Sequence, residues 1–169
     1  MQRIDIFPIS VWVESLSVDK KQLLDDIQKI KEEDSGVSKS NFGGYQSNED
    51  AIFKLPYLQK EITESFQKIL PDLKLQCGWI NINKKGDHNY QHVHPGSILS
   101  CAYYVTDPKE CFNISDPNLA RIMNENSQEL FRPKLKEGDI IIFPSWLPHY
   151  VSANPNDDER ISISCNYGF

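Results

Sequence analysis

The chain from Leu73 onward consists of short apolar or alternating segments separated by turn dipeptides, and this pattern most limits the folds open to the sequence. Pairs such as Lys85-Gly86, Asp107-Pro108 and Glu137-Gly138 mark the turns. Many short strands with regular turn signals are typical of an all-β sandwich or barrel, here of jelly-roll type. The predicted strands are Leu73–Asn83, Leu99–Val105, Phe112–Ser115, Asp139–Phe143, Tyr150–Ala153 and Ile161–Tyr167.

Two helices are predicted before these strands. Ser17 is a candidate cap for a helix that continues to about Glu33. A second helix is predicted from about Tyr57 to Leu70 and ends before Pro71. Each has apolar residues on one face, as expected for helices that pack on a core; these residues are Leu23, Leu24, Ile27 and Ile30, and Leu58, Ile62, Phe66 and Ile69.

The remaining N-terminal segments are an extended stretch and a loop. Residues Ile4–Trp12 are predicted to be extended, with a break at Pro8, and the Ser-, Gly- and Asn-rich segment 35–48 is predicted to be a loop. That loop is either a lid over a site or an ordinary connector. Together these elements predict one domain, 1–169, mainly β with flanking helices. In it a helical buttress of about 17–71 supports a double-stranded β-helix of about 73–169.

Composition narrows the class of partner. The chain has 169 residues, 39% hydrophobic residues and a formal net charge of −6. The acidic balance argues against a nucleic-acid partner, because phosphate backbones require a basic face. No apolar run approaches the roughly 18–20 residues that span a bilayer, so we expect no membrane partner. The N-terminus carries charge where a signal peptide is apolar. We therefore expect a cytoplasmic protein.

Histidine is concentrated at one place in the sequence. Three of the four histidines, His88, His92 and His94, fall within seven residues, and His149 follows a Phe-Pro-Ser-Trp-Leu-Pro segment. Neutral imidazole is the commonest protein ligand for a redox-capable metal. Two ligands one residue apart on an extended segment, with a third from a distant strand, can close three corners of a coordination sphere. His88 is more typical of a loop residue or of a group behind the ligands.

The spacing of these histidines resembles the paired motifs of the cupin superfamily. Five residues separate Gly86 from His92-x-His94, and five also separate Gly138 from Pro144, with His149 five positions beyond. The usual glutamate after His-x-His is absent, and Trp146 replaces a usual glycine. The resemblance therefore supports a cupin-like jelly roll, and a plain cupin metal set only in part.

The C-terminal strand resembles that of iron(II) oxygenases that use 2-oxoglutarate. Arg160-x-Ser162 looks like the pair that anchors the distal carboxylate of 2-oxoglutarate, since the guanidinium can bind a carboxylate through two hydrogen bonds. The alternative is a surface arginine that opens a strand. In prolyl-hydroxylase-like enzymes the tyrosine equivalent to Tyr104 donates to 2-oxoglutarate. Most of the chain resembles a phage- and bacteria-associated family of these oxygenases with a His-x-His-Pro motif, here at His92–Pro95.

The identity of the middle metal ligand stays open. In most of these oxygenases the triad is two histidines and a carboxylate, whereas this chain has His94 in the middle position. Three alternatives remain: His94 is the ligand itself, Asp116 folds in as the carboxylate, or the site uses two histidines and water. We prefer His94, because its spacing from His92 matches the His-x-Asp pair, whereas Asp116 is suited to capping a turn before Pro117.

The resemblance implies a hydroxylase that uses Fe(II), O₂ and 2-oxoglutarate and releases succinate and CO₂. Its substrate is expected to be a protein side chain or a small metabolite. Trp79 and Trp146 are candidates for a pocket wall or for the core. The alternatives are a cupin-type dioxygenase or isomerase without 2-oxoglutarate, and a non-enzymatic metal- or sugar-binding jelly roll. If the chain is phage-encoded, it would act in the host cytoplasm.

Overall fold

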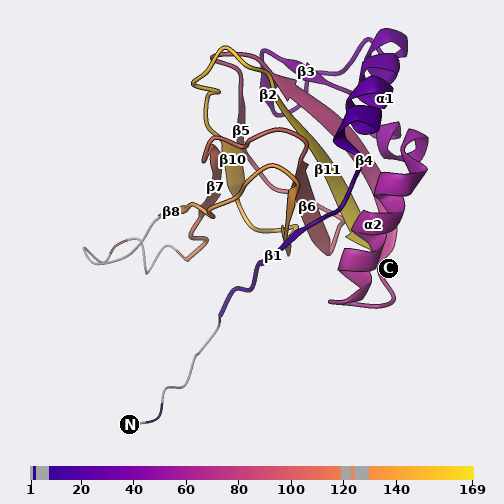
Figure 1. The fold of residues 1–169 in the computed structure, drawn as a ribbon. Helices are drawn as coiled ribbons and strands as arrows, with labels where there is room; N and C mark the ends of the chain where they lie inside the picture. The colour runs from indigo at the N-terminus through magenta and orange to yellow at the C-terminus, as the bar shows by residue number, and fades with distance from the viewer. Residues whose placement is uncertain (1, 3–7, 119–122, 124–129) are drawn as a thin grey trace.

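The computed structural model describes residues 2, 8–118, 123 and 130–169, and these form two antiparallel sheets with two helices packed on one of them (Figure 1). The six-stranded sheet has the order β1-β9-β6-β11-β4-β3, and the five-stranded sheet the order β2-β5-β10-β7-β8. This arrangement confirms the predicted mainly β fold with a helical buttress. No helix in these ranges is long and apolar enough to cross a bilayer.

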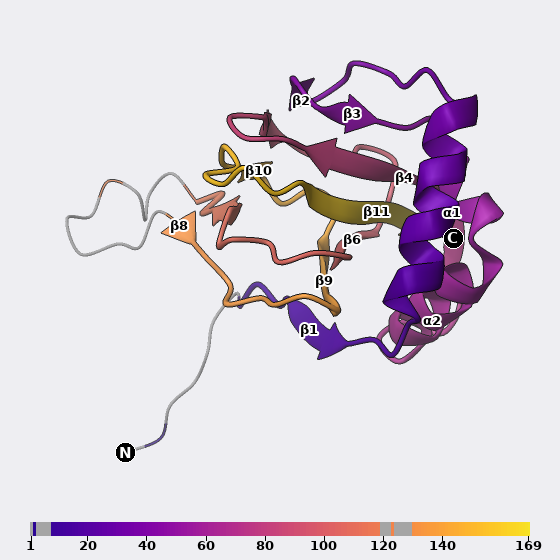
Figure 2. The same cartoon turned by 45° about the horizontal axis from the view of Figure 1, so that its top comes forward.

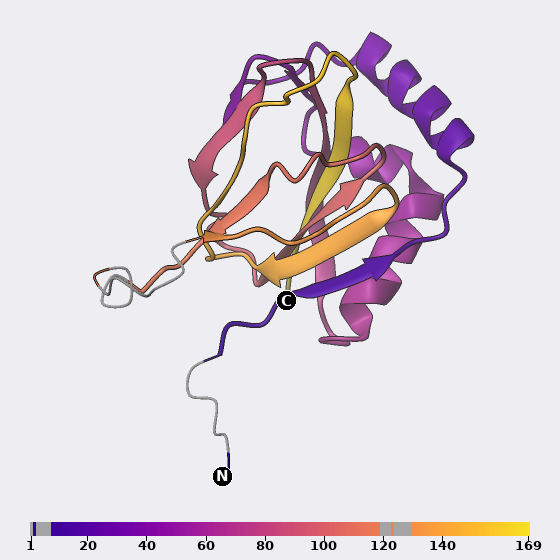
Figure 3. The ribbon, with the colours of Figure 1, turned by 60° about the vertical axis from the view of Figure 1, so that its left-hand side comes forward.

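Consecutive strands often lie in different sheets, as Figure 3 shows from the side of the second sheet. The strands of the first sheet are β1 (Trp12–Ser15), β3 (Tyr45–Gln46), β4 (Lys74–Asn83), β6 (Leu99–Tyr104), β9 (Asp139–Pro144) and β11 (Arg160–Gly168). Those of the second are β2 (Asn41–Phe42), β5 (His88–His92), β7 (Phe112–Ser115), β8 (Leu130–Phe131) and β10 (His149–Val151).

The first helix, α1 (Lys20–Glu33), begins two residues later than the sequence suggests. Its cap is Asp19, whose side chain accepts a hydrogen bond from the Gln22 amide at 3.1 Å. The prediction of Ser17 as the cap is therefore wrong, because Asp19 supplies the oxygen at the position where the first free amides point. The buried face is the predicted one and consists of Leu23, Ile27 and Ile30.

The second helix, α2 (Pro56–Gln67), follows a short 3₁₀ turn at Ala51–Lys54. Pro56 is suited to the first helical turn, where its missing N–H would have no intrahelical partner. Phe66 stacks on Tyr167 of β11 with ring centroids 3.7 Å apart. Figure 2 shows both helices against the sheet that contains β4 and β11.

The strands of the six-stranded sheet have apolar residues on both faces, because helices cover one face and the second sheet covers the other. On β9, Ile140 and Ile142 belong to the core beneath the helices. Ile141 and Phe143 belong to a smaller core between the two sheets. The metal candidates lie at one end of this second core.

Two predictions for the N-terminal half need correction, and one strand in the middle of the chain was missed. Among the described residues, β1 is at Trp12–Ser15, so the predicted extended stretch Ile4–Trp12 joins a sheet only at Trp12; Pro8–Val11 form no strand, and Ile4–Phe7 lie outside the described residues. Segment 35–48 contains β2 and β3 rather than loop alone, and each joins a different sheet. Strand β5 was not predicted, because its polar residues lack an alternating apolar pattern.

Candidate metal centre

Strands β5 and β10 bring two of the histidines face to face. His149 is the cross-strand partner of His92, and Val151 is the partner of Asn89, so the register shifts between these pairs. Three residues along β5 thus correspond to two along β10, which is a bulge. In a regular strand Asn89 and His92 would point to opposite faces, yet both line one cavity. The bulge therefore turns His92 inward.

The predicted triad forms one cluster. His92, His94 and His149 each offer a ring nitrogen, and these atoms lie within 4.8 Å of one another. The ring centroids are 4.4 Å apart for His92 and His149, and 4.9 Å apart for His94 and His149. The chain thus brings its three histidine candidates together, at a spacing that could hold one metal ion.

Hydrogen bonds on Nδ1 determine which nitrogen each ring can offer. His92 Nδ1 lies 2.7 Å from the Tyr90 carbonyl oxygen, and His149 Nδ1 lies 2.9 Å from that of Leu147. A carbonyl oxygen only accepts, so in both rings Nδ1 carries the proton and donates. Nε2 is then the nitrogen with a free lone pair. Such a bond on the other nitrogen is typical of metal-binding histidines.

His94 is oriented by a buried hydroxyl network that the sequence did not reveal. Its Nδ1 lies 2.8 Å from Ser100 Oγ, and Ser100 donates to Asn166 Oδ1 at 2.8 Å. Ser100 therefore accepts from the His94 ring. Ser145 Oγ lies 2.7 Å from Ser100 Oγ, and the backbone carbonyl of Ser145 accepts a hydrogen bond from the His94 amide at 2.8 Å. His94 Nε2 is buried without a partner in the described ranges, as expected of an atom meant for a metal.

Burial keeps the three rings neutral at ordinary pH. It lowers the pKa of His149 to about 3 and that of His94 to about 4, with a smaller effect from the neighbouring histidines. Burial also lowers the pKa of His92. A metal binds only the deprotonated ring. The donor set therefore fits a divalent transition metal without any proton first being removed.

Two other candidates lie outside the cluster. Asp116 borders a separate apolar cavity with Ile114 and Pro117, and its carboxylate accepts the Asn118 amide at 2.8 Å. That contact is the turn-capping role that was weighed against metal binding. His88 stacks on the exposed ring of Phe42 at 4.8 Å between ring centroids and is not part of the cluster.

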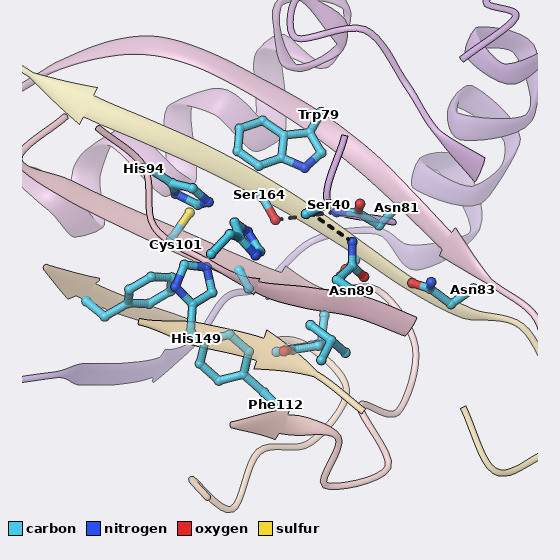
Figure 4. Close-up of a pocket in the computed structure, with 16 residues that line it drawn as sticks. Ser40, Trp79, Asn81, Asn83, Asn89, His94, Cys101, Phe112, His149 and Ser164 are labelled. Atoms are coloured by element: carbon cyan, nitrogen blue, oxygen red, sulfur yellow. Dashed lines mark hydrogen bonds between the residues drawn. The ribbon is translucent and has the colours of Figure 1, made fainter. Parts of the chain in front are cut away.

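A narrow cavity of about 30 Å³ extends from the triad between the two sheets. Figure 4 shows His94 and His149 at one end, with Trp79 beside them, and three asparagines toward the other end. These are Asn81, Asn83 and Asn89; Asn81 is bonded to Ser164, and Asn89 to Ser40. Asn81 follows Trp79 by two residues on β4, so the two side chains lie on the same face of the strand.

The predicted carboxylate-binding residues lie near this cavity. Tyr104 and Ser162 line it, whereas Arg160 precedes Ser162 on the same face of β11 and is only 2% exposed. Arg160 Nη1 donates to the Ser152 carbonyl at 3.0 Å, and Nη2 is buried with no partner among the described residues. Burial raises the pKa of Tyr104, and the charge of Arg160 opposes that rise. Arg160 is therefore a buried cation and not a surface residue.

A wider cleft of about 480 Å³ opens on the outer side of the triad. His92, His94 and Trp79 line both the cleft and the cavity. Segment 35–48 borders the cleft through Ser40 and Gln46, so it faces the site, and its movement as a lid stays a prediction. Trp79 is thus a pocket wall, whereas Trp146 is 55% exposed and lines neither space.

Solved structures similar to this chain include enzymes that depend on 2-oxoglutarate. The 2-oxoglutarate-dependent epimerase SnoN from nogalamycin biosynthesis aligns over 95% of this chain and 78% of its own, with 15% identity and a TM-score of 0.75. HygX from Streptomyces hygroscopicus was solved with nickel, 2-oxoglutarate and hygromycin B bound. It aligns over 95% of this chain and 83% of its own, with 12% identity and a TM-score of 0.69. A prolyl hydroxylase from Trichoplax adhaerens aligns over 94% of this chain and 83% of its own, with 14% identity and a TM-score of 0.65. At such identities the likeness shows the fold alone.

Family comparison gives a more specific result. No curated protein matches the sequence. The sequence profile described as "Putative 2OG-Fe(II) oxygenase" matches residues 77–166. This range runs from β4 through most of β11 and contains the three clustered histidines, Tyr104 and Arg160. The chain belongs to the 2OG-Fe(II) oxygenase family.

Proposed function

We propose that the protein is an Fe(II)- and 2-oxoglutarate-dependent oxygenase that hydroxylates a C–H bond, with O₂ as the oxidant. In the balanced reaction the substrate R–H, O₂ and 2-oxoglutarate give R–OH, succinate and CO₂. The observation that carries the proposal is the pairing of two features in one interior. Three neutral histidines with free Nε2 atoms lie at one end, and a buried arginine with an unpaired Nη2 lies toward the other.

His92, His94 and His149 would hold the iron. Backbone carbonyls orient two of the rings, and Ser100 orients the third, so the ligand nitrogens are prearranged. Three neutral ligands leave the charge of the ion uncompensated until an anionic cosubstrate arrives. This favours binding of the dianion 2-oxoglutarate next to the metal.

Arg160, Ser162 and Tyr104 would hold the distal carboxylate. A buried guanidinium with a free N–H costs stability unless an anion approaches it. The described cavity has room for only about two waters. Binding of 2-oxoglutarate therefore requires neighbouring side chains to move apart.

When bound, Fe(II) and 2-oxoglutarate supply the oxidising power for the C–H bond. The chain's own residues position and enclose the reactants. Phe112, Phe143 and Ala102 form the apolar part of the cavity wall and limit the access of water. We propose that the substrate, a protein side chain or a small metabolite, approaches through the wider cleft, where two of the metal-binding histidines are accessible.

The first test measures succinate from 2-oxoglutarate by the iron-loaded protein under O₂, together with bound iron. The chain should form succinate, and His149→Ala should lose both iron and turnover. His88→Ala is the matched control, because its ring lies outside the cluster, and it should keep both. Stoichiometric iron in His149→Ala, or no succinate from the iron-loaded chain, would refute the proposal.

The second test addresses the cosubstrate. Loss of a charge-assisted pair costs about 3 kcal/mol, which is roughly a 100-fold rise in KM for 2-oxoglutarate. Arg160→Ala should show this rise with its iron retained, and Arg160→Lys should recover part of the loss. Arg132→Ala, on an exposed arginine, is the control. An unchanged KM in a folded Arg160→Ala protein would remove Arg160 from the site.

A further inference from the structure

The cleft outside the triad has the size and position of a small-molecule site. Its volume of about 480 Å³ falls within the range of about 300–1,000 Å³ that is usual for ligand pockets. His92 and His94 form part of its wall, so a molecule bound there lies beside the metal candidates. The cleft adjoins the interior cavity that would take the cosubstrate, and the two spaces share the walls formed by His92, His94 and Trp79.

The lining of the cleft carries no net charge. Its one lysine and its one acidic residue, Lys39 and Glu49, form an ion pair with each other at the rim. The two histidines of the wall belong to the metal cluster. The remaining polar groups are mostly side-chain amides, from Gln46, Gln91 and Asn166. A phosphorylated or polyanionic ligand would find no free cation in this lining.

One of those amides has an unused acceptor. Gln46, on β3, is only 3% exposed, and its Oε1 is buried without a hydrogen-bond partner in the described part of the chain. A buried acceptor without a partner costs about 1–3 kcal/mol. A ligand O–H that reaches this oxygen would recover that cost. Gln46 therefore favours a ligand that carries a hydrogen-bond donor, such as a hydroxyl.

Aromatic rings complete the cleft on two sides. Trp79 is largely buried, with its ring edge-on to His94 at 5.4 Å between centroids. Tyr90 is 54% exposed at the mouth and meets the rings of His88 and Phe42 at 5.1 and 6.1 Å. Flat apolar faces next to amide groups suit a ring that has C–H bonds on its faces and hydroxyls at its edge.

We infer that the cleft binds a neutral polyhydroxylated ring, a sugar or a cyclitol, and presents one of its C–H bonds to the metal. The inference rests on the proposed function and names its substrate class. A peptide fits less well, because the Tyr90 amide already donates to the Ser40 carbonyl at 2.8 Å and is not free to pair with an added strand.

Calorimetric titration of the full chain tests the inference with defined probes. The probes are myo-inositol and methyl glucoside, with glucose 6-phosphate and a blocked proline tripeptide as comparisons. Titrations are run with the metal-free chain, and again with Fe(II) and 2-oxoglutarate without oxygen. At least one of the two neutral ring probes should bind in both states, and more tightly than either comparison probe. Failure of both neutral probes, or tighter binding of the phosphate or the peptide, would overturn the inference.

Two variants identify the binding residues. Gln46→Leu should weaken binding about 10-fold, the equivalent of one hydrogen bond of about 1.4 kcal/mol. Its thermal stability should stay the same or rise, because an apolar side chain replaces an unsatisfied acceptor. A purely structural role would instead lower stability. Tyr90→Ala should also weaken binding, whereas the controls Gln28→Leu, on the exposed face of α1, and Tyr150→Ala, outside the cleft, should not.

The assay separates this inference from the proposed function. Succinate formation without binding of any neutral ring would leave the oxygenase standing and refute the substrate class. Ring binding that depends on Gln46, without turnover of 2-oxoglutarate, would refute the oxygenase and leave the cleft assignment standing. Undiminished binding to Gln46→Leu would overturn the role of that residue.

Discussion

Acidification should destabilise the metal-free protein between about pH 7 and pH 5, because two buried histidines stay neutral when folded. The pKa of His149 falls to about 3 and that of His94 to about 4, from 6.5 in the unfolded chain. The unfolded state therefore binds more protons as the pH falls below 6.5. As the pH falls below 6.5, the folded protein therefore loses stability progressively, and the loss levels off near the folded pKa values of the two histidines.

The size of the expected loss in folding free energy depends mainly on the pKa of histidine in the unfolded chain. At pH 5 an unfolded histidine is almost fully protonated while the folded ring is neutral, which costs about 2 kcal/mol relative to pH 7. Two such histidines give about 4 kcal/mol, a large share of the roughly 5–15 kcal/mol of a typical domain. His92, whose pKa is also lowered, acts in the same direction. Carboxylates with lowered pKa values, such as Asp34, have an unfolded value of 3.8 and contribute little above pH 5.

Urea unfolding of the chelator-treated protein, followed by tryptophan fluorescence, measures this effect. With a slope of about 2 kcal/mol per molar urea, the midpoint should fall by roughly 2 M between pH 7 and pH 5. His149→Leu removes one titrating ring and should show about half of this fall. A midpoint that is the same at both pH values, or an unchanged fall in His149→Leu, would refute the reasoning.

Three further predictions concern the support of the site and the fold. Ser100→Ala removes the acceptor that orients His94 and should weaken iron binding about 10–100-fold in a metal titration; unchanged affinity would exclude that role. Gly43→Ala should lower the free energy of urea unfolding by about 1–3 kcal/mol, because φ of Gly43 is +66° and an added Cβ would lie 2.1 Å from Asp87 Oδ1. An unfolding free energy equal to that of the unchanged protein would contradict this prediction. Phe66→Ala opens a cavity in the core beneath the helices and should cost about 3–5 kcal/mol of folding free energy, which lowers Tm by roughly 10 °C in a thermal melt. A loss below about 1 kcal/mol would be inconsistent with the complete burial of Phe66.

The strand pattern and the ligand types could be predicted from the sequence because both are local properties. Alternating or apolar segments between turns predicted β4, β6, β7, β9 and most of β11, since covered strands must be apolar on the faces they bury. The spacing of His92 and His94, and the motif around His149, predicted which imidazoles would converge. Arg160-x-Ser162 predicted two neighbours on one strand face, because side chains alternate with a period of two.

Contacts between distant segments were not predictable in this way. Strand β5 has mainly polar residues, so its pairing with β10 and the bulge that turns His92 inward left no periodic signal. Ser100, Ser145 and Asn166 come from three separate strands or turns and form a network only when those elements pack together.

The sequence by itself therefore determined the class of fold, the family and the identity of the histidine cluster, since these depend on patterning and on chemical type. The tertiary structure decided which nitrogen of each ring is free. It also separated Asp116 from the triad and placed Gln46, from a segment predicted as a loop, in the cleft beside it. The physical reason is that hydrogen-bond partners, burial and the direction of a side chain depend on residues far away in sequence. Only the packed sheets bring those residues within reach of one another.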